Sequence, residues 1–171
     1  MSKRDLKKYL SNLNIEQLQE QILELYDKFN DVKVYYDFAF NPKEDKLIQE
    51  AKLKIANEYF PIRGKKAKLR RSVSQKIIKH YTTLGVDSFI IADIMLYNLE
   101  IAQTYTSEKI IKQELFFKSM LNSFEQAISF MIDKGILYEF QTRVIAVKDE
   151  AISQEWINKY EFNAIVERFE Y

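Results

Sequence analysis

The fold is decided by residues 87–105, which read DSFIIADIMLYNLEIAQTY. Asp87 is a good N-cap, because its carboxylate can accept hydrogen bonds from the unpaired backbone N–H groups of a first helical turn. The residues after it are apolar on nearly every side of a helix, and such a helix belongs in the interior of a protein. We therefore predict a central helix from Ser88 to about Tyr105, with the other helices packed around it.

Three more helices are predicted before this segment. Each follows a residue that can cap a first turn, namely Asn14, Asn41 and Ser72. The second should stop at Phe60, because a proline follows, and the third at Gly85, because glycine readily adopts the left-handed conformation of a helix C-terminus. The predicted helices cover about residues 15–29, 42–60 and 73–84.

The C-terminal part also has a helical pattern. A long helix is predicted from about Glu108 to Lys134, ending at Gly135. Residues 137–147 fit a helix or a strand, with helix favoured, and a last helix from about Ile152 to Arg168 should dock as a lid. The inward positions of these helices are predicted to be Ile111, Leu115, Met120, Phe124, Ile128 and Met131, followed by Ile152, Trp156 and Tyr160.

These patterns predict an all-α fold. We expect a compact bundle of seven to nine helices in one domain, residues 1–171, and irregular antiparallel pairs, as in helical-repeat proteins, are one arrangement that fits. Hydrophobic residues make up 47% of the chain, which is enough for a sizeable core. No internal repeat of fixed period and no long linker divides the sequence.

Composition also bears on location and chemistry. The chain has no cysteine, which excludes disulfides, thiol nucleophiles and thiolate metal sites. Residues 1–8 are too charged for a secretory signal, and the most apolar stretch, residues 89–99, is too short to cross a bilayer. We expect a cytoplasmic protein without a membrane partner.

Positive charge is concentrated in one short segment. The formal net charge is +1, yet residues 61–80 contain eight basic residues and no acidic one, while residues 81–171 contain eight basic and fourteen acidic residues. Together with a serine, these basic side chains form the candidate binding site. Its members are Arg63, Lys65, Lys66, Lys68, Arg70, Arg71, Ser72, Lys76 and Lys79.

Two interpretations of this basic segment remain open. If Ser72 caps a helix, Arg70 and Arg71 stand at the positive end of its dipole, where an anion is favoured and extra cations are not. That placement indicates a site for a phosphate-rich or acidic partner, with nucleic acid as the leading example. Alternatively, the two arginines pair with this protein's own acidic C-terminal half, which has six acidic residues between Asp149 and Glu170.

One polar stripe interrupts the central helix. Its members are Asp93, Tyr97, Glu100 and Thr104. Paired carboxylates in a half-buried groove can bind a metal or perform acid–base chemistry. The other interpretations are a solvent edge or an internal ion pair with Arg70, Arg71 or Lys79.

Known catalytic patterns are otherwise missing. A phosphate-binding P-loop needs two glycines that flank four residues, and Tyr59 stands where the first glycine would precede Gly64. The single histidine, His80, lies at the edge of an apolar stripe and is better explained as a boundary residue than as a catalytic base. We expect no catalytic residue, no metal and no cofactor.

Several segments resemble those of a known family. They are residues 1–10, Tyr35-Tyr36-Asp37-Phe38, the run from Phe40 to Lys46, Arg70-Arg71-Ser72-Val73, Leu84-Gly85-Val86-Asp87, Ala92-Asp93 and Tyr97-Asn98. As a set they resemble a family of small bacterial proteins catalogued as a domain of unknown function. The resemblance extends to about Gly135 and implies a bacterial cytoplasmic origin, with no activity or cofactor attached.

Three hypotheses for function follow. The first is a non-enzymatic interaction module that uses the basic segment to bind a phosphate-rich or acidic partner. The second is a self-associating scaffold, in which the basic loop of one copy meets the acidic C-terminal region of another. The third is an enzyme that uses Asp93 and Glu100.

Overall fold

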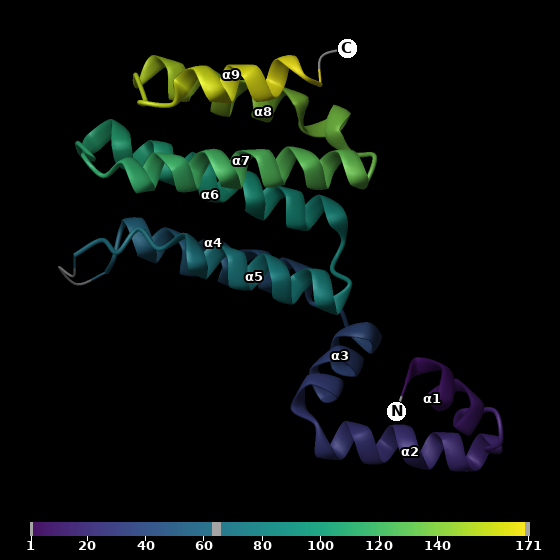
Figure 1. Ribbon diagram of the computed structural model, residues 1–171. Helices are drawn as coiled ribbons and strands as arrows, with labels where there is room; N and C mark the ends of the chain where they lie inside the picture. The colour runs from purple at the N-terminus through teal and green to yellow at the C-terminus, as the bar shows by residue number, and fades with distance from the viewer. Residues whose placement is uncertain (1, 63–65, 170–171) are drawn as a thin grey trace. The chain divides into compact units, whose positions relative to one another are not determined.

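The computed structural model describes residues 2–62 and 66–169, and in these ranges the chain forms nine helices and no strand (Figure 1). The predicted all-α class and helix number are therefore confirmed. The helices are α1 (Lys3–Leu10), α2 (Ile15–Lys28), α3 (Asn30–Phe40), α4 (Glu44–Tyr59), α5 (Arg71–Leu84), α6 (Ser88–Glu108), α7 (Glu114–Asp133), α8 (Leu137–Ser153) and α9 (Lys159–Glu167).

The contacts divide the chain into two units. Unit 1 is Met1–Lys43 and contains α1, α2 and α3; unit 2 is Glu44–Tyr171 and contains α4 to α9. The expectation of one domain over residues 1–171 stays a prediction. None of the described helices has the length and apolar run that crossing a bilayer requires.

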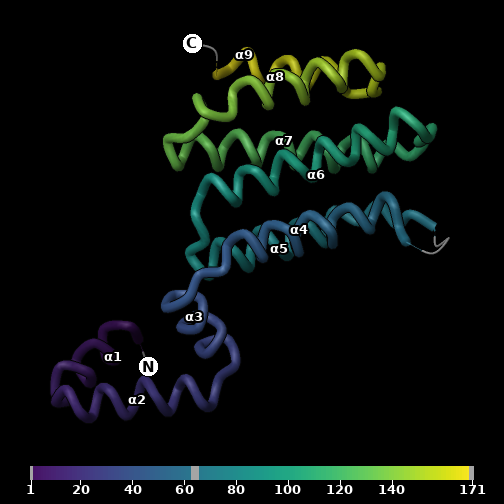
Figure 2. The backbone as a smooth tube through the Cα atoms, turned by 180° about the vertical axis from the view of Figure 1, so that it is seen from behind, coloured from purple at the N-terminus to yellow at the C-terminus, as the bar shows by residue number. Residues whose placement is uncertain are grey.

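Unit 2 is a stack of three helical pairs. The α4–α5, α6–α7 and α8–α9 pairs form successive layers, which Figure 1 and the reverse view in Figure 2 show. Helix α6 packs against α4, α5, α7 and α8, so the predicted central position of this helix is confirmed. Its buried residues cover more than half of the helix circumference, and the polar stripe with Asp93 and Glu100 lies on the remaining side. They are Ile91, Ala92, Ile94, Met95, Leu96, Asn98, Leu99, Ala102 and Gln103.

Several predicted helix ends are confirmed. Asn14 and Gln17 form the reciprocal capping box at the start of α2, and the Asp87 carboxylate accepts a hydrogen bond from the Phe89 backbone N–H. Gly85 and Gly135 have φ of 76° and 69°, the left-handed conformation that ends α5 and α7.

Two predicted starts are wrong because the capping side chains have other partners. Helix α4 begins at Glu44 itself, whose carboxylate accepts a hydrogen bond from the Asp87 N–H at 3.2 Å instead of closing a box on Asn41. Helix α5 begins at Arg71 with Arg70 as its N-cap, so Ser72 lies inside the first turn. The amide of Gln75, which would have closed the Ser72 box, donates to Gln126 on α7.

The C-terminal half differs from the prediction at two breaks. Helix α6 extends to Glu108 and α7 starts only at Glu114, with Phe116 and Phe117 buried and Leu115 80% exposed. The predicted last helix is divided, because α8 continues to Ser153 and Glu155 adopts a left-handed φ of 52°. This turn places Trp156 inside, whereas the other two members of the predicted stripe, Ile152 and Tyr160, are exposed.

An aromatic cluster fills the core between α7 and the C-terminal turn. The rings of Phe124 and Phe162 are 4.9 Å apart, and Trp156 lies 5.6 Å from Phe162 and 5.4 Å from Phe117. Phe124 and Phe162 have no solvent exposure. Aromatic pairs at these distances add to the free energy of burial, so this cluster fixes α9 to α7.

Unit 1 is built from three short amphipathic helices. A Ser2–Asp5 capping box starts α1, and α3 begins one residue after α2 ends at the bend of Phe29. The Tyr26 hydroxyl on α2 donates a 2.7 Å hydrogen bond to the Asp37 carboxylate on α3, which raises the pKa of Tyr26. Sequence analysis predicted α2 and missed α1 and α3.

Candidate interaction surfaces

The basic segment runs along the connection from α4 to α5 and continues on α5. Arg63 and Lys65 lie outside the described residues. The side chains of Lys66, Lys68, Ser72, Lys76 and Lys79 are exposed. The four lysines form no salt bridge with any described residue, and we refer to them as the lysine face.

Arg70 is occupied within unit 2. Its Nε and Nη2 groups each donate a 2.8 Å hydrogen bond to the carboxylate of Glu58, near the end of α4. The hydrogen bond from Arg70 holds the pKa of Glu58 below its ordinary value, against the opposing effect of burial. The Glu58 carbonyl also accepts hydrogen bonds from the backbone N–H groups of Lys68 and Leu69. Glu58 therefore fixes the chain just before α5.

Arg71 is occupied by α7. Its Nε donates to the Ser123 hydroxyl at 2.7 Å, and its Nη2 donates to the Gln126 side-chain oxygen at 2.8 Å. Burial lowers the pKa of Arg71. Both arginines thus have internal partners, and the described contacts connect neither of them with Asp93, Glu100 or the acidic C-terminal region.

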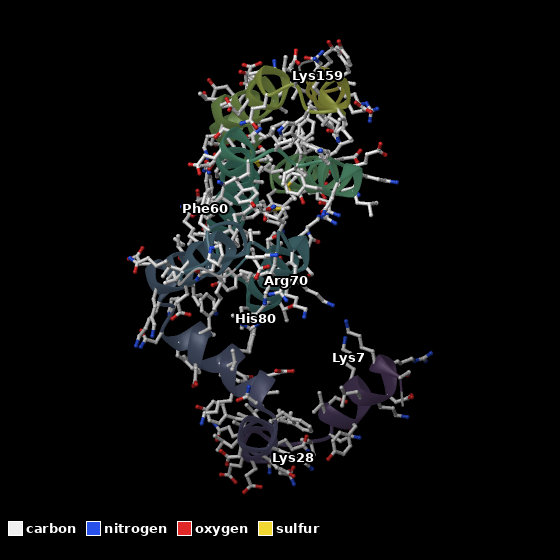
Figure 3. All side chains as sticks on the ribbon, turned by 90° about the vertical axis from the view of Figure 1, so that its left-hand side faces the viewer. Lys7, Lys28, Phe60, Arg70, His80 and Lys159 are labelled. Carbon is white, nitrogen blue, oxygen red and sulfur yellow. The ribbon has the colours of Figure 1, made fainter. Side chains whose placement is uncertain are left out.

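His80 lies on the second half of α5, and Arg70 at its start; Figure 3 labels both. The histidine is exposed, and its nearest aromatic partner is Tyr81, at 6.0 Å between ring centroids. No described contact pairs it with a carboxylate. Its surroundings supply none of the partners that orient a catalytic base.

The carboxylates of α6 form a charge cluster with two cations. Arg143 on α8 donates to Asp93 at 2.7 Å and to both oxygens of Glu100 at 2.8 and 2.9 Å. Lys52 on α4 lies 2.7 Å from the second Asp93 oxygen and above the Tyr97 ring at 5.2 Å. The charge cluster therefore connects one helix from each of the three layers.

The charge cluster is better suited to a structural role than to acid–base catalysis. Burial alone would raise the pKa of Asp93, but the hydrogen bonds from Lys52 and Arg143 outweigh it and hold the pKa below its ordinary value. A general acid or base at neutral pH needs a shift in the other direction. Within the described residues, no three His, Asp or Glu side chains come together as metal ligands.

Unit 1 leaves many of its apolar side chains exposed. Helices α1, α2 and α3 contain no buried residue. The large hydrophobic side chains that they and the Phe29 bend expose are Leu6, Tyr9, Ile15, Ile22, Leu23, Leu25, Phe29, Tyr35 and Phe40. Many exposed apolar side chains on one small unit are typical of a protein interaction site.

A groove of about 530 Å³ lies between α2 and α3. It is lined by Gln19, Ile22, Leu23, Tyr26, Tyr36, Asp37 and Phe40. We call it the α2–α3 groove. Its α2 residues recur at steps of three and four, so they form one face of that helix. The stacked rings of Tyr36 and Phe40, 6.0 Å apart, form the other wall.

A second, smaller groove of about 220 Å³ lies at the end of unit 2. Its lining comes from α7, α8 and α9 and from Phe169, two residues after α9. The other lining residues are Ile128, Leu137, Tyr138, Gln141, Val144, Ile145 and Val166. Unlike the α2–α3 groove, it contains residues of a buried core, such as Ile128 and Val144. This second groove is therefore a depression in the surface of a packed unit, and it exposes less apolar surface than the α2–α3 groove does.

The sequence analysis missed the apolar surface of unit 1. The signal that could have found it is the density of apolar residues before Pro42, which exceeds what three short helices can bury in one another. The charge cluster was half found, because its carboxylates were identified and its cations were not. Lys52 and Arg143 lie 41 and 50 positions from Asp93 in the sequence.

Together, the fold and these surfaces define an all-α protein with a stack of helical pairs and an exposed apolar unit. The chain belongs to DUF6155, a family of unknown function, whose model matches residues 1–170. The predicted resemblance to a domain of unknown function is confirmed. No curated protein and no solved structure matches the chain.

Proposed function

We propose that the protein is a non-enzymatic interaction module, and that its α2–α3 groove binds an amphipathic helix of a protein partner. The observation that carries this proposal is that unit 1 buries none of its described residues, while its groove is lined mainly by apolar and aromatic side chains. Units of about forty residues usually need a further source of stability, and association is one such source.

The groove suits a helix better than a small ligand. It is open along two helices, and its α2 wall presents Ile22, Leu23 and Tyr26 at helical spacing. A partner helix with apolar residues at steps of three and four would interdigitate with such a wall. The polar lining residues, Gln19 and Asp37, can bond to the polar edge of that helix.

The openness of the α2–α3 groove can be tested with the dye Nile red, which fluoresces in apolar sites. At low protein concentration we expect Leu23→Gln to lower the dye fluorescence of the full chain, because Leu23 is a 62% exposed wall residue. Leu53→Gln is the matched control, since Leu53 on α4 is 63% exposed and outside the groove. Equal fluorescence of the Leu23 variant and the unmodified chain would mean that other parts of the protein already cover the groove.

A second candidate function concerns the lysine face. Its four exposed lysines have no ion pair among the described residues, and residues 61–80 contain no carboxylate. This surface would bind a phosphate-rich partner such as nucleic acid, or the acidic C-terminal region of a second copy. Arg70 and Arg71 would support the lysine face through Glu58 and α7 instead of contacting the partner.

Nucleic-acid binding should show the salt dependence of phosphate neutralisation. If about three phosphates are neutralised, log affinity for single- or double-stranded DNA or RNA should fall with log salt at a slope near −3. We expect Lys68→Ala with Lys76→Ala and Lys79→Ala to abolish most of this slope. The control variant, Lys112→Ala with Lys118→Ala and Lys134→Ala, removes the same number of positive charges outside the lysine face. It should leave the slope nearly unchanged. Equal losses in both variants would contradict a localised site.

A further inference from the structure

We propose that the α2–α3 groove is occupied by helix α1 of a second copy of this chain, so that each of two copies places α1 in the groove of the other in a two-fold symmetric dimer. This inference rests on the proposed function, because it names the helix that the groove binds. It differs from the self-association predicted from the sequence, in which the basic loop meets the acidic C-terminal region.

The side chains of α1 match a helix of the required type. Leu6, Tyr9 and Leu10 recur at steps of three and four and form one apolar stripe. Leu6 and Tyr9 are 41% and 47% exposed, so nearly half of the surface of each remains accessible to a partner. Four of the eight residues of α1 are basic, and Asp5 is its one acidic residue. Helix α1 is thus a short basic amphipathic helix.

The charge of α2 is complementary to that of α1. Four of its fourteen residues are acidic and Lys28 is its one basic residue. Glu16, Glu20 and Asp27 are exposed. Because successive residues of a helix are rotated by about 100°, these three lie on the same side of α2, within about 100° of the groove-lining residue Gln19. The apolar groove therefore has an acidic flank, and Lys3 and Lys7 flank the apolar stripe of α1 in the same way.

The groove is not filled by α1 of its own chain. The groove lining contains no α1 residue. The Tyr9 hydroxyl of α1 instead accepts a 2.6 Å hydrogen bond from the side chain of Gln21, which points away from the groove because it lies about half a turn from Gln19 and Leu23. This is the one side-chain hydrogen bond that holds α1 on α2 in the described part of the chain, and it lies at the surface. Detaching α1 from α2 therefore breaks no buried side-chain hydrogen bond among the described residues.

A two-fold axis satisfies both copies at once. Each chain supplies one α1 helix and one α2–α3 groove, so a symmetric pair forms the same contact twice and leaves no free copy of either for further growth. In the dimer, the apolar side chains that unit 1 exposes become a shared core.

The experiment is a charge swap in the full chain, read by analytical ultracentrifugation over a concentration series. The unmodified protein should dimerise. Lys3→Glu with Lys7→Glu makes α1 acidic, and Glu20→Lys with Asp27→Lys makes the groove flank basic. Each variant alone faces like charges, so its dissociation constant should rise at least about ten-fold. An equimolar mixture of the two variants should again form a dimer, because every α1 then meets a groove of opposite charge.

The mixture separates the proposed contact from misfolding, because unfolded variants cannot restore each other. A monomer at every concentration of the unmodified chain would overturn the proposal, and so would variants that dimerise like it or a mixture that stays monomeric. The proposed function fails on a different readout. If Nile red shows an open groove while the chain stays monomeric, the groove binds another protein's helix and only the second copy is excluded.

Discussion

Phe162→Ala is expected to lower the free energy of unfolding of unit 2 by about 3–5 kcal/mol, the largest effect of any single substitution proposed for this protein. Phe162 has no solvent exposure, and its ring packs 4.9 Å from Phe124 and 5.6 Å from Trp156. Removing the ring leaves a cavity that the helices around it cannot fully close. Helix α9 would lose its main anchor to α7.

Chemical denaturation followed by tryptophan fluorescence measures this effect directly. Trp156 is the only tryptophan of the chain and lies within the aromatic cluster. Tyr160→Ala on the same helix is the control, because Tyr160 is 76% exposed and its removal should change stability by less than about 1 kcal/mol. A loss for Phe162→Ala as small as that of the control would mean that α9 is not held by this cluster.

Asp93→Ala should have the second-largest effect, a loss of about 2 kcal/mol at neutral pH. The Asp93 side chain is 25% exposed, and its carboxylate forms one ion pair with Lys52 and one with Arg143. The expected loss lies between that of an exposed ion pair, up to about 1 kcal/mol, and that of a fully buried one, about 3–5 kcal/mol. Asp149→Ala is the matched control, since its carboxylate is 59% exposed and Lys148 is its one ion-pair partner among the described residues.

The difference in unfolding free energy between the unmodified chain and the Asp93→Ala variant should change with pH in a defined direction. The pKa of Asp93 in the folded chain lies below its ordinary value of 3.8, so the ionised carboxylate stabilises the folded state. This contribution is fully present above about pH 5 and disappears as the pH falls through the folded pKa. The unfolding free energies of the unmodified chain and the Asp93→Ala variant should therefore converge in acid. A difference that stays constant down to pH 2 would contradict a role for the charge.

The elements that local chemistry determines were predicted well. A cap such as Asp87 and a glycine such as Gly85 act within one helical turn, so their effects can be read from neighbouring residues. The interior position of α6 follows from its own composition for the same reason. The division of the C-terminal segment at Glu155 was not predicted, because what stabilises the break is the burial of Trp156 against residues far away in the sequence.

The candidate sites were harder to predict because they depend on partners from other helices. Arg70 and Arg71 read as an anion site when only their neighbours in sequence are considered, yet Glu58 and Ser123 supply their hydrogen bonds. Similarly, the missing partner of Asp93 was Arg143, on a segment whose class, helix or strand, the sequence left ambiguous. The lysine face was easier to predict, since an exposed charged residue can be recognised from the local sequence pattern alone.

The layered order of unit 2 has a consequence for the growing chain on the ribosome. Successive pairs, α4–α5, α6–α7 and α8–α9, pack mainly against pairs that come just before or after them in the sequence. The loops that must close before each new contact forms are therefore short, which lowers the entropic barrier to folding. As synthesis proceeds, each emerging pair meets a surface that is already formed, so unit 2 can assemble from α4 onward without waiting for its C-terminus.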